Sequence, residues 1–207
     1  MPSYRSFLPL VELCDNFNIP AKHPDLVSFC ITSDTKSVVG LLQPSVVERL
    51  LDDNEKAARA GQQPSWGVIY HGQTEASLPQ VIRAMHFSEH LSSRELRSAA
   101  INKLCWKWHE EGFFLDVIGG RLWRFELYPV YASPFGTYER DNMAFEIERA
   151  AATLFGVVTY TIQMTLYMPP PPGSNEETKI WVSTRAKNKQ EWVYYFTIYA
   201  LVYSDGY

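Results

Sequence analysis

The chain has 207 residues, of which 46% are hydrophobic and 14% are aromatic. This composition supplies a core for one medium domain, or for one small domain and part of another, and it excludes disorder along the whole chain. The net charge of −4 comes from 23 acidic and 19 basic residues that are mixed along the sequence. Because nucleic-acid binding needs a clustered basic face, no nucleic-acid polymer is expected as a partner.

The cysteines and the hydropathy pattern bear on the compartment. Cys14, Cys30 and Cys105 are widely spaced and form no C-x-x-C pair, which is typical of free thiols in a reducing compartment. The longest apolar run, Trp192–Tyr203, is shorter than the roughly 20 residues that a membrane span needs. The N-terminus shows no signal-peptide pattern. We therefore expect a soluble, cytoplasmic protein without a membrane partner.

The first part of the chain predicts two helices and four short strands. Apolar positions in residues 5–18 favour a short amphipathic helix, and Pro44 suits the first position of a second helix. The buried stripe of that second helix is predicted at Val46, Val47, Leu50 and Leu51. The predicted strands are Leu26–Ile31, Lys36–Leu42, Trp66–Tyr70 and Gln80–Phe87.

The next segment predicts the clearest helix of the chain. Ser92-x-x-Glu95 has the pattern of a capping box at its start, and Gly112 is predicted to stop it. The apolar face of this helix is predicted at Leu96, Ala100, Leu104 and Trp108. Gly119-Gly120 then predicts a hairpin, and its two strands would be Phe113–Ile118 and Arg121–Tyr131.

Residues 122–157 carry the most distinctive pattern. An aromatic and β-branched run ends near Pro129, and Asp141 with Asn142 predicts the cap of a helix that closes in a left-handed turn at Gly156. The apolar positions of that helix are Ala144, Ile147, Ala151, Leu154 and Phe155, and two strands are predicted after it at Val157–Met168 and Lys179–Arg185. Strands and helices that do not alternate regularly predict the α+β class.

Three motifs in the second half of the chain resemble one family. They are WRFELYPVY at residues 123–131, ERAAATLFGVVTY at residues 148–160 and KIWVSTRAKNKQEW at residues 179–192. Together they are similar to Nudix hydrolases with an N-terminal accessory domain, a DUF4743-like type that is related by description to thiamine pyrophosphokinase. Segments Val38–Leu51 and Arg94–Leu104 fit the same accessory domain.

The resemblance implies three parts. Residues 1–135 would form the accessory α+β domain, and residues 142–192 the incomplete start of a Nudix α/β/α sandwich, with a boundary in residues 133–142. Residues 193–207 would be an atypical tail, because they do not continue the family pattern after Trp192. The resemblance therefore implies a Nudix domain that is truncated before the Nudix box.

The expected activity follows from the same resemblance. The family is expected to cleave the diphosphate of thiamine-diphosphate-like or oxidised nucleotide substrates with Mg²⁺, which needs clustered carboxylates. Arg94-Glu95-Leu96 and Glu110-Glu111-Gly112 imitate only fragments of the Nudix box, and we interpret them as surface charges. We expect no catalytic residue, no metal ligand and no Mg²⁺ in this chain, so the chain itself is expected to be inactive. Whether it counts as an enzyme stays open, because the resembled family is one of hydrolases. The alternative is a non-catalytic module that binds a small-molecule diphosphate or a partner.

Arg185 and Lys187, followed by Lys189, form a short basic run. In the resembled family the corresponding segment lies on the edge of the Nudix pocket, so the resemblance suggests that Arg185 and Lys187 bind the phosphate of a substrate. The alternative interpretation is a solvated strand end.

Other polar and aromatic groups have structural and functional interpretations. His86-Phe-Ser-Glu89-His90 spells the zinc motif H-x-x-E-H, but it straddles the end of a predicted strand, which favours histidines in a loop. Arg124 and Glu126 would share one face of a strand and form a structural ion pair. The residues expected to pack the core, or alternatively to clamp a thiazole or pyrimidine ring, are Trp106, Trp108, Trp123 and Tyr128.

Overall fold

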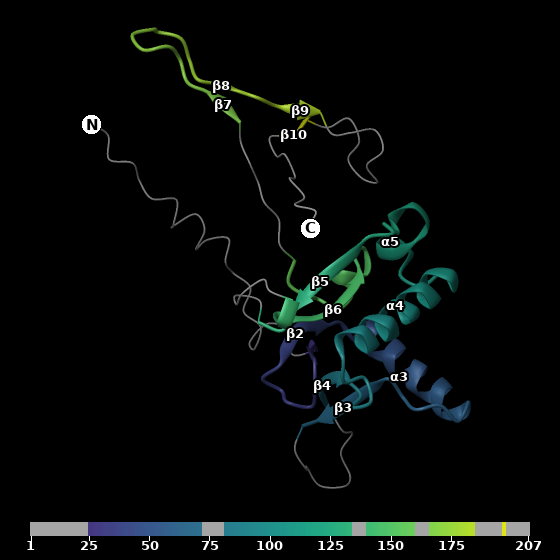
Figure 1. The fold of residues 1–207 in the computed structure, drawn as a ribbon. Helices are drawn as coiled ribbons and strands as arrows, with labels where there is room; N and C mark the ends of the chain where they lie inside the picture. Colours follow the sequence, from purple (N-terminus) through teal and green to yellow (C-terminus); the bar gives the residue numbers. More distant parts are fainter. Residues whose placement is uncertain (1–24, 72–80, 134–139, 160–165, 185–195, 198–207) are drawn as a thin grey trace.

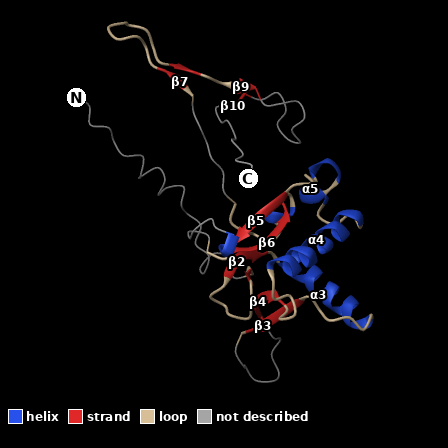
Figure 2. Ribbon diagram, viewed as in Figure 1, coloured by secondary structure: helices blue, strands red, loops and turns tan. Residues whose placement is uncertain are grey.

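A computed structural model describes residues 25–71, 81–133, 140–159, 166–184 and 196–197. It has the predicted α+β fold, in which a four-stranded sheet and a two-stranded hairpin lie beside two long helices (Figure 1, Figure 2). The helix predicted in residues 5–18 and most of the tail, residues 193–207, lie outside the described residues. No helix in the described part of the chain has the length and apolar character of a membrane span.

The four-stranded sheet confirms the four strands predicted in the first part of the chain. Its order is β2-β1-β4-β3, in which β1 pairs with β4 in parallel and the two outer pairs are antiparallel. The strands are β1 (Val27–Cys30), β2 (Val38–Leu42), β3 (Trp66–Tyr70) and β4 (Ile82–Phe87).

The two long helices begin and end with recognisable caps. Helix α3 (Pro44–Arg59) starts at the predicted proline. Helix α4 (Arg94–Glu110) ends just before the predicted glycine, Gly112, which follows the C-cap residue and has φ +74°. The N-cap of α4 is Ser93, whose hydroxyl accepts a hydrogen bond from the Leu96 amide at 3.2 Å. The capping box predicted at Ser92 is therefore wrong by one residue.

The hairpin predicted at Gly119-Gly120 is wrong. The first predicted strand contains a short helix, α5 (Leu115–Ile118), and Gly120 begins the 3₁₀ turn η1 (Gly120–Leu122). Only β5 (Leu127–Tyr131) remains of the second predicted strand. The chain turns early because the amides of Val117 and Ile118 both bond to the Phe114 carbonyl at 2.9 Å, which is a pattern that the glycine pair does not reveal.

The helix predicted after Asn142 is also wrong. The turn η2 (Arg140–Asn142) leads into strand β6 (Met143–Glu148), which pairs antiparallel with β5, and η3 (Ala151–Thr153) follows. Phe145 and Ile147 are buried on either side of the half-buried Glu146, as in a strand. The apolar residues of this segment fit the spacing of a strand as well as that of a helix, and pairing with β5 decides between the two structures. The left-handed turn at Gly156 is confirmed by φ +56°.

The free edge of β6 is bonded to side chains of α4 in place of another strand. The Arg97 Nε donates to the Ala144 carbonyl at 2.9 Å, and the Ser98 hydroxyl accepts from the Glu146 amide at 2.9 Å. Asn102 donates to the Glu146 carbonyl at 2.8 Å and accepts from the Glu148 amide at 2.7 Å. These bonds satisfy backbone groups that would otherwise be buried without partners.

One aromatic core joins the sheet to β6 and to the segment that follows it. The Phe29 ring lies 5.3 Å from the rings of Phe87 and Phe155 and 6.1 Å from the ring of Phe145, measured between centroids. All four side chains are buried. Residues on both sides of the predicted boundary at 133–142 therefore share a core, although the division into domains stays a prediction.

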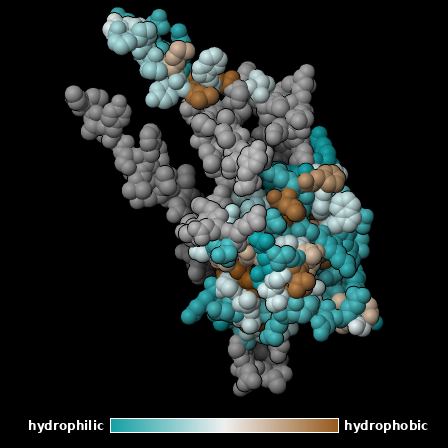
Figure 3. All heavy atoms as spheres, in the orientation of Figure 1, coloured by the Kyte–Doolittle hydropathy of each residue, from teal (hydrophilic) through white to brown (hydrophobic). Residues whose placement is uncertain are grey.

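The last described strands are short. The pair β7 (Tyr167–Met168) and β8 (Lys179–Ile180) forms a hairpin that Figure 1 shows apart from the main body, and β9 (Ser183–Thr184) pairs with β10 (Phe196–Thr197). Among described residues 157–159 and 166–168, only the last two form the strand predicted at Val157–Met168. Apolar atoms are visible at this hairpin, whereas the surface near α3 and α4 is mostly hydrophilic (Figure 3). The exposed apolar residues of the β7–β8 hairpin and its flanks are Leu166, Tyr167, Met168, Ile180, Trp181 and Val182.

Candidate functional site

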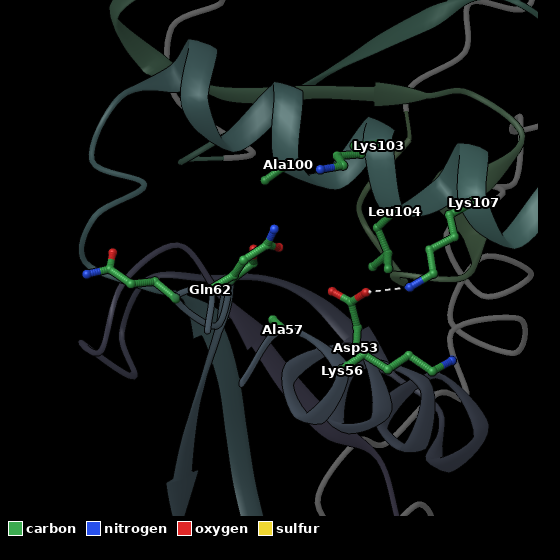
Figure 4. Close-up of a pocket in the computed structure, with 10 residues that line it drawn as sticks. Asp53, Lys56, Ala57, Gln62, Ala100, Lys103, Leu104 and Lys107 are labelled. Atoms are coloured by element: carbon green, nitrogen blue, oxygen red, sulfur yellow. Dashed lines mark hydrogen bonds and ion pairs between the residues drawn. The ribbon is translucent and has the colours of Figure 1, made fainter. Parts of the chain in front are cut away.

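A polar cleft of about 220 Å³ lies between α3, α4 and the loop that follows α3 (Figure 4). Figure 4 shows Asp53 and Lys107 bonded across it, with Lys103 on the α4 side and Ala57 on the α3 side. The ten lining residues are Asp53, Lys56, Ala57, Gln62, Gln63, Ser65, Ala100, Lys103, Leu104 and Lys107.

The α3 wall of the cleft continues the buried stripe of that helix. Val46 and Leu50 are buried, and one turn further along the same face the side chain is Asp53 and then Ala57. The Asp53 carboxylate accepts from the Trp66 indole nitrogen at 3.2 Å and from the Lys107 ammonium at 3.1 Å. Because Trp66 is buried, its bond fixes the position of the carboxylate at the cleft.

The loop from Ala60 to Ser65 is held over the cleft by a helix cap. The Gly61 amide bonds to the Ala58 carbonyl at 3.0 Å and the Gln62 amide to the Ala57 carbonyl at 2.8 Å, the two bonds of a Schellman motif. Gly61 has φ +69°, which a residue with a Cβ adopts only with strain. This turn brings Gln62 and the next residues of the loop back to the cleft.

The far end of the same loop is tied to α3. The Asn54 side chain donates to the Trp66 carbonyl at 2.6 Å and accepts from the Trp66 amide at 3.1 Å. The loop is therefore anchored at both ends, by the Schellman motif and by this pair of bonds. Two anchors fix the backbone at both ends of the loop before any ligand arrives.

The α4 wall supplies two of the three lysines. Ala100, Lys103, Leu104 and Lys107 recur at the spacing of one helix face. Leu104 is buried and forms an apolar floor with Ala57 and Ala100, and the two small alanines leave room between the helices. Lys103 is exposed, and within the described residues its ammonium has no salt-bridge partner.

The cleft has an excess of positive charge. Three lysine ammonium groups against the single Asp53 carboxylate leave a net charge of +2 among the lining residues. Lys56 lies 2.7 Å from the Asp52 carboxylate, and this hydrogen bond lowers the pKa of Asp52 and raises the pKa of Lys56. Lys56 therefore stays protonated at neutral pH, but the Asp52 carboxylate offsets part of its positive charge. Lysine ammonium groups at a cleft of this kind attract anions, and phosphate above all.

A comparison with family models shows the family to which the chain belongs. Residues 6–159 match the model of the family described as "Domain of unknown function (DUF4743)". The chain belongs to the DUF4743 family. No curated protein matches the sequence at a significant level. Both walls of the cleft, α3 and α4, lie inside the matched residues, so the cleft is a feature of the DUF4743 domain itself.

The basic residues predicted to bind phosphate cannot be placed beside this cleft. Arg185 and Lys187, together with Lys189, lie outside the described residues, so their role stays a prediction. Among the described residues of the DUF4743 domain and the following segment, no group of three or more His, Cys, Asp or Glu side chains could hold a metal ion.

The H-x-x-E-H sequence does not lie on a helix. His86 is buried in β4, where its Nδ1 lies 2.8 Å from the Phe87 carbonyl, and Glu89 and His90 belong to the turn that follows. The two histidines therefore do not share a helical face. The predicted loop position is therefore confirmed for His90 and wrong for His86, which is a buried residue of β4.

The fragments that imitate a Nudix box lie at opposite ends of α4. Glu95 is in the first turn, where hydrogen bonds from its own amide and from Ser93 lower the pKa of its carboxyl, and Glu110 is the last residue of the helix. The 17 residues of α4 separate the two ends by about 25 Å, at about 1.5 Å per residue. These carboxylates cannot act on one metal ion.

The ion pair predicted between Arg124 and Glu126 is wrong. Residues 123–126 are not a strand, and Glu126 pairs with Arg149 at 2.6 Å. The Arg124 amide donates instead to the buried Glu148 carboxylate at 3.1 Å. Glu148 therefore joins the segment before β5 to the end of β6.

The predicted aromatic residues divide between the core and the surface. Trp108 is buried and stacks on Phe155 at 5.9 Å, which confirms its core position. Trp106 is 41% exposed and contacts Trp123 edge to face at 5.2 Å. Trp123 is buried, which confirms its predicted core position, and neither Trp106 nor Trp123 lines the α3–α4 cleft. An aromatic clamp for a thiazole or pyrimidine ring stays a prediction.

The sequence carried only a partial signal for the cleft. Polar residues on the expected apolar face were available as a clue, since Asp53 follows Leu50 at helical spacing and Lys107 follows Leu104. Asp53 and the three lysines belong to no motif in the sequence, and their position at a site was not predicted. The meeting of α3 and α4 is a tertiary contact, and no local pattern encodes it.

Proposed function

We propose that the DUF4743 domain is a non-catalytic binding module that holds the phosphate groups of a small molecule in the α3–α4 cleft. The observation that carries this proposal is that Lys56, Lys103 and Lys107 line one cleft whose lining residues have a net positive charge. Ammonium groups that come from two helices can contact two phosphates at once. Small-molecule diphosphates are therefore the expected ligands, and thiamine diphosphate and nucleoside diphosphates are the first to test.

We also propose that this module belongs with Nudix chemistry. The motifs at residues 123–131, 148–160 and 179–192 support that relationship. In this proposal, residues 142–192 begin a Nudix fold whose phosphate edge includes Arg185 and Lys187, and the protein works in the cytoplasm. A Nudix box with Mg²⁺ would hydrolyse the diphosphate, but these 207 residues contain no Nudix box. The chain alone is therefore proposed to bind without hydrolysis.

Calorimetric titration with sodium pyrophosphate tests the binding proposal. We expect saturable binding to the wild-type chain and a dissociation constant about tenfold higher for Lys103→Ala, because a charge-assisted hydrogen bond is lost. Lys36→Ala is the matched control, since Lys36 is an exposed lysine in the turn between β1 and β2, away from the cleft. The control is expected to bind as the wild type does.

Two results would contradict the proposals. Pyrophosphate binding that Lys103→Ala and Lys36→Ala weaken equally would mean that the anion meets only a diffuse surface charge. Release of phosphate from thiamine diphosphate or ADP in the presence of Mg²⁺, by the purified chain, would contradict binding without hydrolysis. Repeating the assay with a variant that removes the cleft lysines would then show whether the cleft is the reactive site.

A further inference from the structure

The polar groups of the cleft define its ligand more closely than the lysines do. We infer that the α3–α4 cleft takes a phosphorylated compound rich in hydroxyl groups, of the sugar phosphate class. This inference rests on the proposed function, because the lysines remain the phosphate half of the site. The second half is formed by Asp53 with the side chains of the loop after α3.

Three polar side chains at the cleft have unused hydrogen-bonding capacity. Within the described residues, Gln62, Gln63 and Ser65 line the cleft, and their side chains form no hydrogen bond to the protein. Each glutamine amide offers two donor hydrogens and an acceptor oxygen, and the serine hydroxyl can donate or accept. These groups match a ligand hydroxyl, which also donates and accepts.

Asp53 adds an acceptor that is fixed in position. Its carboxylate has about four acceptor positions, and the Trp66 indole and the Lys107 ammonium use two of them. The remaining positions can accept hydrogen bonds from ligand hydroxyls. A phosphate ester without hydroxyls is mostly a dianion at neutral pH and then has no such donor, so a carboxylate at this point favours a ligand whose phosphate is attached to a hydroxyl-bearing group.

The shape and chemistry of the floor agree with this class. Ala57, Ala100 and Leu104 form a small apolar surface that can contact the C–H groups of a sugar. None of the ten lining residues is aromatic, so the cleft offers no ring for stacking a planar base. Its volume of about 220 Å³ is below the roughly 300–1,000 Å³ of pockets for drug-sized molecules, which favours a compact ligand.

The test compares ribose 5-phosphate with methyl phosphate, which carries the same phosphate without hydroxyls. Calorimetric titration of both into the wild-type chain is expected to give about fivefold or greater preference for ribose 5-phosphate. The double variant Gln62→Ala with Gln63→Ala is expected to lose most of that preference. Gln43→Ala is the matched control, because Gln43 is exposed at the opposite end of α3 and its side chain makes no cap hydrogen bond.

Each outcome decides the inference separately from the proposed function. If pyrophosphate binds but the two monophosphates bind equally, the inference is overturned and the phosphate site stands. If the double variant keeps the full preference, the loop residues do not read the hydroxyls and the inference is overturned. If pyrophosphate, ribose 5-phosphate and methyl phosphate all fail to bind, both proposals are contradicted.

Discussion

Helix α4 carries polar side chains on two sides, and the two sides differ in what they contact. Toward β6, Arg97, Ser98 and Asn102 are bonded to the strand backbone at 2.7–2.9 Å. Toward α3, Lys103 lines a cleft and has no salt-bridge partner in the described residues. A polar side chain that is bonded to buried backbone groups therefore stabilises the fold, whereas a polar side chain that lines a cleft without a protein partner is available to a ligand.

The largest effect is expected on the β6 side. Asn102→Ala removes the partners of the Glu146 carbonyl and the Glu148 amide, and each unsatisfied buried group costs about 1–3 kcal/mol. We expect the free energy of unfolding to fall by about 3 kcal/mol in urea denaturation. A loss below about 0.5 kcal/mol, the range of ordinary surface substitutions, would break the comparison.

The core-facing side of α4 gives a pH-dependent prediction. Burial raises the pKa of the Cys105 thiol above its ordinary value, and the nearby Glu148 charge raises it further. Below the pKa that the Cys105 thiol has in the unfolded chain, the thiol is neutral in both states and the full stability is present. Above that pKa the thiol ionises only in the unfolded chain, so the folded protein loses stability as the pH rises. We expect the free energy of unfolding to fall by about 1.4 kcal/mol per pH unit above roughly pH 9 from this group.

Cys105→Ala is the variant that isolates this contribution. Buried Cys30 has a pKa raised in the same direction, so part of the alkaline loss should remain in the variant. Urea denaturation at pH 8 and at pH 10 should therefore show a smaller difference for Cys105→Ala than for the wild type. If the free energy of unfolding had the same pH dependence in the wild type and in Cys105→Ala, the raised pKa of the Cys105 thiol would be contradicted.

On the α3 side of α4 the effect should appear in binding. Lys103→Ala is expected to weaken pyrophosphate binding about tenfold, or about 1.4 kcal/mol. Raising the salt concentration should weaken wild-type binding as well, because exposed charges are screened. A salt-independent affinity measured by calorimetry would mean that the lysines do not hold the phosphate.

The smallest effect is expected for an ion pair on the exposed side of α3. Arg59 and Glu55 are 2.9 Å apart, and their side chains are 75% and 66% exposed. Glu55→Ala should change the free energy of unfolding by about 0.5 kcal/mol or less, because such pairs are well solvated. Thermal denaturation of Glu55→Ala and Asn102→Ala side by side would show whether an exposed ion pair contributes much less stability than hydrogen bonds to a buried strand edge. A loss of 2 kcal/mol or more would contradict it.

The elements that sequence predicts well are those with local signals. Pro44 marks the start of α3, Gly112 the end of α4 and Gly156 a left-handed turn, since each sets its own backbone geometry. The strands β1 to β4 follow from short apolar runs between turn residues. The wrong predictions lie at Gly119-Gly120 and in residues 143–155, where a local pattern fits two structures and long-range pairing chooses one.

The candidate site was harder to predict because it depends on three separated segments. Asp53, Gln62 and Lys103 are each ordinary in their local sequence, and only the packing of α3 against α4 brings them to one cleft. Polar residues on both sides of α4 also look alike in sequence. Asn102 and Lys103 are adjacent, and the structure alone separates the residue that bonds to β6 from the residue that lines the cleft.

This adjacent pair provides the most direct test of the account. Urea denaturation and pyrophosphate titration would both be measured on Asn102→Ala and on Lys103→Ala, at a temperature where both variants are folded. We expect Asn102→Ala to lose about 3 kcal/mol of stability and keep its affinity for pyrophosphate, and Lys103→Ala to keep its stability and bind pyrophosphate about tenfold more weakly. Equal losses of stability and affinity in both variants would contradict the separation of a structural side and a binding side on α4.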